Sequence, residues 1–312
     1  MNLGPFESML LGALLAAAGG ELFVRGTVGI AHRLSIPPAL IATTLAAFAT
    51  SSPELVVAIR SALAGTPQIA LGNVLGANLV DIALVLGLSL AIAPSPISRV
   101  GLGRDLPAAV ALPVLTMAFA AIGGLGRIAA LVLLAVFGVW FARTLLDMRD
   151  AARAPGDGNP PSNGALPAVA GVLLGVAMLI GAGDALVTGA RGLSARHGWD
   201  PFVVGATLVA LGTTAPELAT VIVARLKGED GVGLGTLLGS LVFNGGLIVP
   251  AAALISPIDA SVAAITIPAA GAIAAVAFLL IVRASVLGRG HGLVLLAIYA
   301  LSVVALFALQ SG

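Results

Sequence analysis

The sequence predicts an all-α membrane protein with ten transmembrane helices, arranged as two inverted five-helix repeats that contain broken helices. Three observations support this fold class: the composition, the recurrence of long apolar segments, and an internal repeat. Of the 312 residues, 59% are hydrophobic and only 9% are charged, whereas a soluble protein of this length carries about 25% charged residues. The chain is therefore expected to cross a membrane many times.

Ten segments are long and apolar enough to cross the hydrocarbon core of a bilayer. They cover residues 6–31, 38–64, 69–93, 105–123, 127–147, 164–193, 201–226, 232–256, 260–283 and 291–310. Prolines such as Pro67, Pro94 and Pro201 mark the joints between them. The N-terminus has neither a basic region nor a small-residue cleavage site, so we expect no removable signal peptide.

The distribution of basic residues sets the expected orientation, because cytoplasmic loops of membrane proteins are enriched in Lys and Arg. Ten spans place both termini on the same side. If that side is outside, the inner loops and their flanks hold Arg33, Arg99, Arg104, Arg143, Arg149, Arg153, Arg225, Lys227, Arg283 and Arg289. The outer ones then hold only Arg60, Arg127, Arg191 and Arg196. We expect both termini outside and the chain to be an integral protein of the cell (plasma or inner) membrane.

The two halves of the chain repeat each other at a spacing of 163 residues. The run Pro53-Glu54-Leu55 returns as Pro216-Glu217-Leu218, and Asp81 corresponds to Asn244. We expect a first repeat over 1–148 with a core at about 37–90, a cytoplasmic linker over 149–163, and a second repeat over 164–312 with a core at about 200–253. Five spans per half invert the second copy, which is the architecture of secondary transporters with a midplane site.

Three acidic residues lie near the centres of the second, third and seventh spans, where an acidic side chain costs about 2.5–3.5 kcal/mol. They are Glu54, Glu217 and Asp81, with Asn244 at the position that corresponds to Asp81. No Lys or Arg lies at the same depth in their four spans. The missing counter-charge must therefore be bound cations, protons or both.

The surrounding residues suit a hard cation, which prefers carboxylate, carbonyl, amide and hydroxyl oxygens. Pro53 and Pro216 remove a backbone donor and kink their helices, which frees carbonyls near Ala49 and Gly212. Hydroxyl oxygens come from Thr50, Ser51, Thr213 and Thr214. The sequence thus predicts that the broken helices line an ion site at the middle of the membrane.

The motifs "ATSSPEL" and "GTTAPEL" are each followed by a G-x-x-x-G-x-x-x-x-[DN] segment that ends 27 residues after the glutamate. Together they resemble the two α-repeats of the cation/calcium exchanger superfamily, and most of all those of prokaryotic sodium/calcium exchangers. The resemblance covers both repeats and the ten-span layout. It implies antiport of calcium against sodium by alternating access, with the first and sixth spans sliding across the others.

The resemblance also implies roles for particular residues. Glu54 and Glu217 would bind calcium with help from Thr50 and Thr213, and the sodium sites would use Ala47, Ser51, Ala210, Thr214 and Ser240. The full candidate set for cations is Glu54, Glu217, Asp81, Asn244, Thr50, Thr213, Ser51, Thr214, Ala47, Ala210, Ser240 and Asn78. Ala77 stands where the family usually has a serine, and Thr236 and Leu241 stand where it has asparagines. The acidic member of the Asp81/Asn244 pair lies in the first repeat, whereas the resemblance leads us to expect it more often in the second.

These departures leave a calcium/proton antiporter on the same scaffold as the alternative, because neighbouring carboxylates disfavour each other's ionisation. A passive channel fits less well, since channels usually assemble a pore by subunit symmetry. An intramembrane aspartyl protease would use the "GAGD" run at 181–184, but it needs a tyrosine-aspartate pair, and the one tyrosine, Tyr299, precedes Ala300.

Other classes of function are excluded by composition. The chain has no cysteine, so disulfides and thiolate metal sites are absent. His32, His197 and His291 all lie near expected loops, which argues against a histidine metal centre. We expect no enzymatic activity, no cofactor, no nucleic-acid partner and no obligatory protein partner, so that the protein functions as a monomer in the lipid bilayer with calcium and sodium (or protons) as the transported ions.

Overall fold

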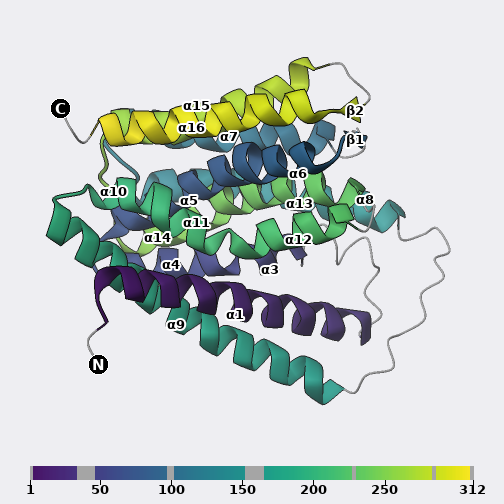
Figure 1. Cartoon of the computed structure of the whole chain (residues 1–312), viewed down its shortest axis with the longest axis horizontal. Coiled ribbons are helices and arrows are strands. Elements are labelled where there is room, and N and C mark those ends of the chain that lie inside the picture. Colours follow the sequence, from purple (N-terminus) through teal and green to yellow (C-terminus); the bar gives the residue numbers. More distant parts are fainter. Residues whose placement is uncertain are drawn as a thin grey trace.

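The computed structural model describes residues 3–33, 46–96, 102–151, 165–226, 230–282 and 286–309, and these are almost entirely helical. The first half contains α1 (Pro5–Arg33), α3 (Ala46–Thr50), α4 (Ser52–Leu63), α5 (Pro67–Leu79), α6 (Leu86–Ile92), α7 (Leu102–Ala121) and α8 (Arg127–Ala151). The second contains α9 (Ala165–His197), α10 (Pro201–Val204), α11 (Ala210–Thr213), α12 (Ala215–Leu226), α13 (Asp230–Phe243), α14 (Val249–Ile255), α15 (Val262–Ile281) and α16 (Arg289–Ala308). Figure 1 shows these helices running roughly along one common direction.

The predicted all-α membrane fold with broken helices is confirmed. Seven helices of the described residues are long and apolar enough to cross a membrane, and two shorter apolar helices cover 105–121 and 201–213. The start of the second expected span, 38–45, and most of the linker over 149–163 lie outside the described residues. The count of ten spans, the domain boundaries and the orientation therefore stay predictions.

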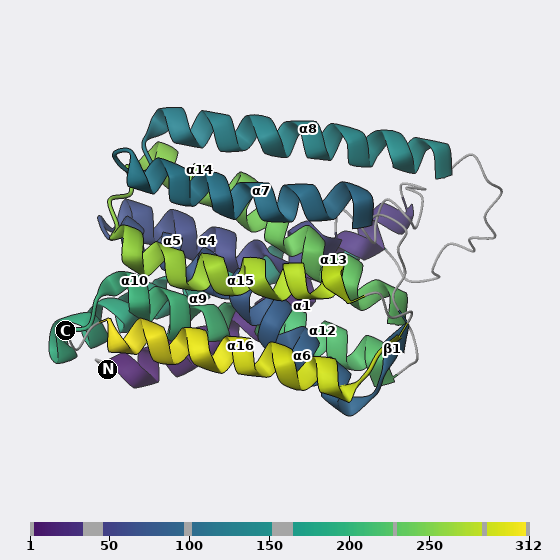
Figure 2. The same cartoon turned by 90° about the horizontal axis from the view of Figure 1, so that it is seen from above.

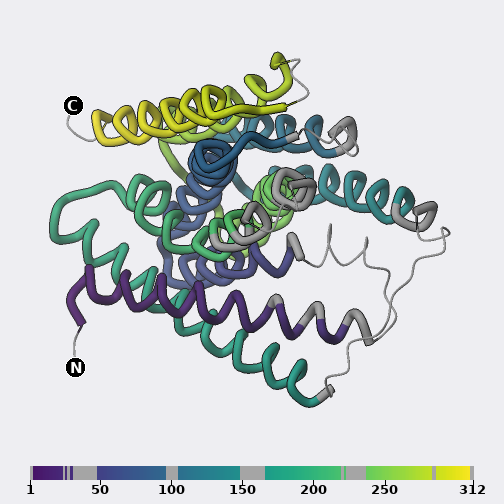
Figure 3. The backbone as a smooth tube through the Cα atoms, turned by 45° about the vertical axis from the view of Figure 1, so that its right-hand side comes forward, coloured from purple at the N-terminus to yellow at the C-terminus, as the bar shows by residue number. Residues whose placement is uncertain are grey.

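The broken helices lie at the centre of the bundle. Figure 1 shows α4, α5, α11, α12, α13 and α14 between a layer of α15 and α16 and a layer of α1 and α9, and Figure 2 shows α7 and α8 side by side at one edge. In the tube of Figure 3, α1 and α9 again run next to each other. These two helices form the most extensive helix pair of the fold and also touch the broken helices, α1 at α3, α11 and α12, and α9 at α4.

Within the described residues, three π-helical segments interrupt the central helices, and the sequence did not predict them. They are η2 (Val80–Val85), η3 (Gly205–Val209) and η4 (Asn244–Ile248). Such wide turns inside α-helices are often found at functional sites. Two of them coincide with the repeat-related pair Asp81 and Asn244, so the backbone is irregular where the buried polar side chains lie.

Glycines allow α5 to approach α10 and η3 at backbone distance, which is typical of closely packed membrane helices. A side chain added at Gly72 would collide with the carbonyl of Phe202, and one added at Gly76 would collide with the backbone of Ala206. A side chain at Gly205 would meet the carbonyl of Ile69 in return. This contact joins the two repeats directly beside the broken helices.

Two short backbone pairings also join the repeats, at opposite ends of α7. Strand β1 (Ser95–Pro96) pairs antiparallel with β2 (Val286–Leu287), with Ser95 opposite Leu287. Beyond the other end of α7, Leu125 and Ile258 exchange backbone hydrogen bonds of 3.0 Å each. The two halves are thus joined by backbone hydrogen bonds before and after α7.

Candidate functional site

The two glutamates occupy equivalent positions just after the helix breaks. The first break lies at Ser51 (φ −80°, ψ 7°) and the second at Thr214 (φ −81°, ψ 5°), between α3 and α4 and between α11 and α12. Glu54 and Glu217 then lie in the first turns of α4 and α12. The N-terminal end of a helix carries a partial positive charge that favours a carboxylate. Each break therefore positions one acidic side chain, as the repeated Pro-Glu-Leu predicted.

The carbonyl that Pro53 leaves without its usual helical donor is that of Ala49. The Ser52 hydroxyl donates a hydrogen bond of 2.6 Å to this carbonyl. The second repeat has Ala215 at the position of Ser52, so no such hydroxyl is supplied to the carbonyl of Gly212. The expected pair of freed carbonyls is thus altered in the first repeat, where a side chain occupies part of the carbonyl's capacity.

The predicted site residues are buried in the protein interior. Glu54 is 1% exposed, and Glu217, Asp81 and Asn244 are 0% exposed. The same holds for the other side chains of the set that the structure describes, namely Thr50, Ser51, Asn78, Ala210, Thr213, Thr214 and Ser240. Ala47 lies in α3, but its side chain is outside the described part of the chain. The polar residues therefore form part of a core that is otherwise apolar.

Buried acceptors in this cluster outnumber the donors available to them. The acceptor oxygens without a hydrogen-bond partner are both carboxylate oxygens of Glu54, both of Glu217, Oδ1 of Asp81 and Oδ1 of Asn244. The only unpartnered amide donors among the described residues are Nδ2 of Asn73 and Nδ2 of Asn78. Leaving a buried charged group without a partner is costly. The cluster thus has a deficit of positive charge.

No cationic side chain makes up this deficit within the described residues. Their two ion pairs, Arg25–Glu21 and Arg60–Asp184, join partly or largely exposed side chains away from the cluster. Glu54 is close enough to interact electrostatically with both Asp81 and Glu217. In the described part of the chain, no three acidic or histidine side chains converge tightly enough to hold a metal by themselves. A cation here would need hydroxyl, amide or carbonyl oxygens as well.

Each glutamate faces the threonine of the other repeat. The Thr213 side chain approaches the carboxylate of Glu54, and Thr50 approaches that of Glu217. Neither hydroxyl is close and aligned enough to complete a hydrogen bond with the carboxylate oxygens. The carboxylate of each repeat is therefore next to a hydroxyl of the other repeat, so both repeats contribute oxygens to each part of the site.

Asp81 lies at the end of a chain of hydrogen-bonded hydroxyls that also includes residues from both repeats. Ser240 donates a hydrogen bond of 3.0 Å to Oδ2 of Asp81, and the hydroxyls of Ser51 and Ser240 are 3.0 Å apart. Asn244 instead donates to Oδ1 of Asn78 at 2.9 Å. One repeat-related position thus carries a carboxylate with two hydroxyls, and the other carries a pair of neutral amides.

The Thr214 side chain and the Ala210 carbonyl bind to each other within the same broken helix. The Thr214 hydroxyl donates a hydrogen bond of 2.7 Å to the carbonyl of Ala210, one turn earlier. Such back-bonding of serine and threonine is common inside helices. Both residues lie near the break, but in this arrangement the carbonyl of Ala210 already accepts from a side chain of its own helix.

Asn73 belongs to the cluster, and sequence reasoning missed it. It is 0% exposed in α5, and its Oδ1 accepts a hydrogen bond of 3.0 Å from the Thr213 hydroxyl. A polar residue one turn before Ala77, next to Gly72 in a glycine-lined helix, was a signal that could have identified it.

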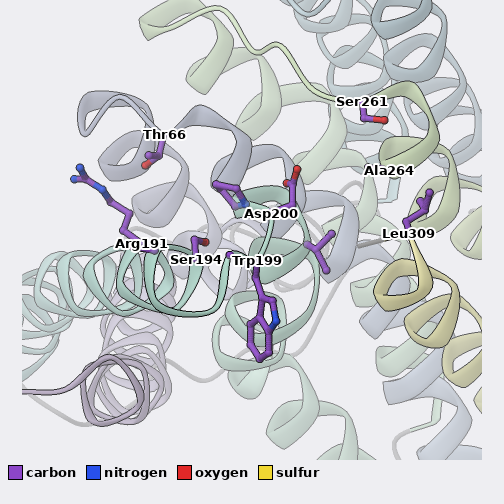
Figure 4. Close-up of a pocket in the computed structure, with 12 residues that line it drawn as sticks. Thr66, Arg191, Ser194, Trp199, Asp200, Ser261, Ala264 and Leu309 are labelled. Carbon is purple, nitrogen blue, oxygen red and sulfur yellow. The ribbon is translucent and has the colours of Figure 1, made fainter. Parts of the chain in front are cut away.

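One cavity of the described residues lies away from this cluster. It encloses about 680 Å³ near the ends of α9 and α16 and is lined by Thr66, Arg191, Trp199 and Asp200, among others. Figure 4 shows these side chains around it. None of the predicted site residues lines this cavity, so the candidate site rests on the buried cluster alone.

Comparison with known proteins finds similarity over both halves of the chain. The family described as sodium/calcium exchanger protein matches residues 6–146 and 167–308, one match in each half. The chain is 31% identical over 266 residues to the putative antiporter CaxA of Alkalimonas amylolytica, covering 82% of each protein. It is 30% identical over 258 residues to the inner membrane protein YrbG of Escherichia coli, covering 80% of this chain and 79% of that one.

Solved structures of the sodium-calcium exchanger NCX_Mj share the fold. One of them, soaked with 2.5 mM Na⁺ and 10 mM Sr²⁺, matches with a TM-score of 0.67 at 26% identity, covering 96% of this chain and 98% of that one. The similarity therefore extends over both repeats and all of the central helices.

Proposed function

Because the chain belongs to the sodium/calcium exchanger family, we propose that it is a secondary active antiporter that exchanges calcium for sodium across the membrane. One observation carries this proposal: the buried cluster around Glu54 and Glu217 has unpartnered acceptor oxygens and no cationic side chain among the described residues. A bound cation would supply the missing positive charge, and an exchanger binds its two kinds of cation in turn at a buried site of this kind.

Calcium would be held between the two glutamates. Calcium takes about 6–8 oxygen ligands, and the carboxylates of Glu54 and Glu217 with the hydroxyls of Thr50 and Thr213 supply part of such a shell. This assignment is supported by the crossed arrangement in which each glutamate faces the threonine of the other repeat.

Monovalent cations would occupy positions beside calcium. The chain of Ser51, Ser240 and Asp81 offers two hydroxyls and a carboxylate with one unpartnered oxygen. The remaining candidates for this role are Ala47, Ala210, Thr214, Asn78 and Asn244. Of these, the amides of Asn78 and Asn244 add neutral oxygen and nitrogen atoms at the repeat-related position.

Alternating access would come from movement of α1 and α9. These two helices pack mainly against each other and contact the broken helices on one face. A pair that is joined internally and touches the site can slide as a unit, and thereby open the site to one side of the membrane at a time. We propose that the protein does this as a monomer in the inner membrane, with both termini outside.

Protons are the alternative coupling ion. Ala77 supplies no hydroxyl at the position related to Ser240, and the Thr214 hydroxyl is engaged by its own helix. One of the expected sodium sites therefore loses a side-chain ligand, and a proton on a carboxylate would not need that ligand.

The test is uptake of radioactive calcium by sealed vesicles that contain the purified protein. One set of vesicles is loaded with sodium and diluted into sodium-free buffer, and the other carries only a pH gradient. Calcium uptake driven by the sodium gradient and lost in Glu54→Gln and Glu217→Gln would support the proposal. Glu7→Gln is the matched control, because Glu7 is an exposed acid at the start of α1.

Two results would change the conclusion. Uptake driven only by the pH gradient would retain the calcium site and replace sodium by protons. Absence of calcium uptake in both sets, with correctly folded protein, would overturn calcium as the substrate.

A further inference from the structure

Asn73 lies beside a place where helices of the two repeats are in backbone contact. It follows Gly72 in α5, and the backbone at Gly72 touches Phe202, while the backbone at Gly205 touches Ile69. The Asn73 amide lies beside Thr213, at the end of α11. Asn73 is fully buried there.

The contacts of Thr213 determine which way its hydroxyl hydrogen points. Thr213 Oγ1 lies 3.0 Å from Oδ1 of Asn73 and 3.3 Å from the carbonyl of Ala210. Both neighbours are acceptors, and a hydroxyl has a single hydrogen to donate. The shorter contact is the one to Asn73, which directs the hydrogen toward α5.

Donation to Asn73 fixes what Thr213 presents to Glu54. A hydroxyl that has given its hydrogen to one partner offers only lone pairs to its other neighbours. Lone pairs repel a carboxylate but bind a cation that the carboxylate also binds. This agrees with the unpartnered state of the Glu54 oxygens even though Thr213 faces them.

We propose that Asn73 is a positioning residue of the cation site: by accepting the Thr213 hydrogen, it keeps the Thr213 oxygen free to coordinate a divalent cation together with Glu54. Asn73 itself does not touch the cation. This inference rests on the proposed function, because it assigns a role within the calcium site. Without Asn73, the Thr213 side chain would lose its shorter acceptor and would be free to turn until its hydroxyl donates to Glu54, in competition with the cation for that carboxylate.

The second repeat lacks this arrangement and provides an internal control. Thr236 is the residue 163 positions after Asn73, so no amide stands at the related place. Thr50, which is related to Thr213, faces Glu217 in a different setting. A change at Asn73 is therefore expected to act through Thr213 and not through Thr50.

The experiment measures calcium uptake in vesicles as a function of calcium concentration for Asn73→Ala, Thr213→Val, Thr50→Val and the two double variants with Asn73→Ala. A lost hydrogen bond to a group that interacts with charge corresponds to roughly a tenfold change in affinity. We expect Asn73→Ala to raise the half-saturating calcium concentration by about this factor and to leave the maximal rate within about twofold. Combined with Thr213→Val, it adds nothing further; combined with Thr50→Val, the two factors multiply.

Asn73→Asp guards against a failure to fold. It has nearly the same shape and retains an acceptor for the Thr213 hydrogen, so calcium affinity is expected to be retained or increased. The inference is overturned if Asn73→Ala leaves the half-saturating concentration unchanged, if its effect persists in the Thr213→Val background, or if Asn73→Asp weakens calcium as much as Asn73→Ala does. Absence of calcium uptake by the unaltered protein is a different outcome, which overturns the proposed function together with this role.

Discussion

The two repeats are alike in backbone but differ in chemistry beside the glutamates. The breaks at Ser51 and Thr214 have nearly identical dihedral angles. Yet the group Ser51, Ser240 and Asp81 corresponds, at the 163-residue spacing, to Thr214, Ala77 and Asn244. The first group is a connected chain of hydrogen bonds ending in a carboxylate, and the second has lost a hydroxyl and the charge. A symmetric scaffold thus holds an asymmetric set of ligands.

The largest expected effect concerns the part that the repeats share. Glu54→Gln and Glu217→Gln each remove one of the two charges that face the central cation, so calcium uptake is expected to fall to the level of empty vesicles in both. The readout is vesicle uptake, with folding checked by gel filtration. If one variant keeps full uptake, the two glutamates are not equivalent and the shared part of the comparison fails.

The next effect is on folding and tests the contact between the repeats. Gly76→Ala would push a side chain into the backbone of Ala206, and overpacking of this kind costs about 1–3 kcal/mol or more. We expect a lower unfolding temperature in detergent. Gly138→Ala is the matched control, because open space surrounds Gly138 in α8 and alanine favours a helix. Equal stability of both variants would contradict the close contact.

A smaller effect is expected where the repeats differ. Asp81→Asn removes the only charge of the Ser51–Ser240–Asp81 chain and makes the two repeat-related positions alike. We expect calcium to bind still, while the dependence of uptake on the sodium gradient weakens. Calcium uptake measured against internal sodium concentration shows this, and an unchanged sodium dependence would remove Asp81 from the coupling site.

The reverse change sharpens the comparison. Ala77→Ser combined with Asn244→Asp gives the second position the groups of the first, so a second monovalent site can form. We expect a steeper dependence of calcium uptake on sodium concentration, with a higher Hill coefficient. A coefficient that stays the same would show that the missing hydroxyl and charge are not what distinguishes the two positions.

The smallest effect is expected at an exposed ion pair that joins the two repeats and has no counterpart at the repeat-related positions. Arg60 of α4 pairs with Asp184 of α9, and their side chains are 41% and 48% exposed. The residues at the related positions are Val223 and Glu21, and Glu21 pairs with Arg25 in its own helix. Exposed pairs contribute about 0–1 kcal/mol. We expect Asp184→Asn to lower the unfolding temperature only slightly, and a double-mutant cycle with Arg60→Gln measures the pair.

Much of this could be predicted from sequence, because membrane insertion makes polarity informative. A glutamate in an apolar segment stands out, and two copies of Pro-Glu-Leu at one spacing indicate both the repeat and the break. The pairing of hydroxyls could not be predicted in the same way. Which threonine faces which glutamate depends on how the broken helices of the two repeats pack together. The π-helical turns at Asp81 and Asn244 rotate side chains in a manner that hydrophobic patterns do not record.

The role of Asn73 could not be predicted from the sequence either. Its residue type and burial were consistent with simple helix packing, and only the contact with Thr213 connects it to the glutamates. The hydrogen-bond direction of a hydroxyl is a property of the assembled site and not of any segment of the chain.

Equilibrium binding of radioactive calcium to the purified protein in detergent tests the central claim most directly, because it needs no gradient and no assumption about the coupling ion. Unaltered protein is compared with Glu54→Gln and Glu217→Gln. The buried, unpartnered carboxylates predict saturable calcium binding that both variants lose. Calcium binding at unaltered affinity in either variant would contradict the account.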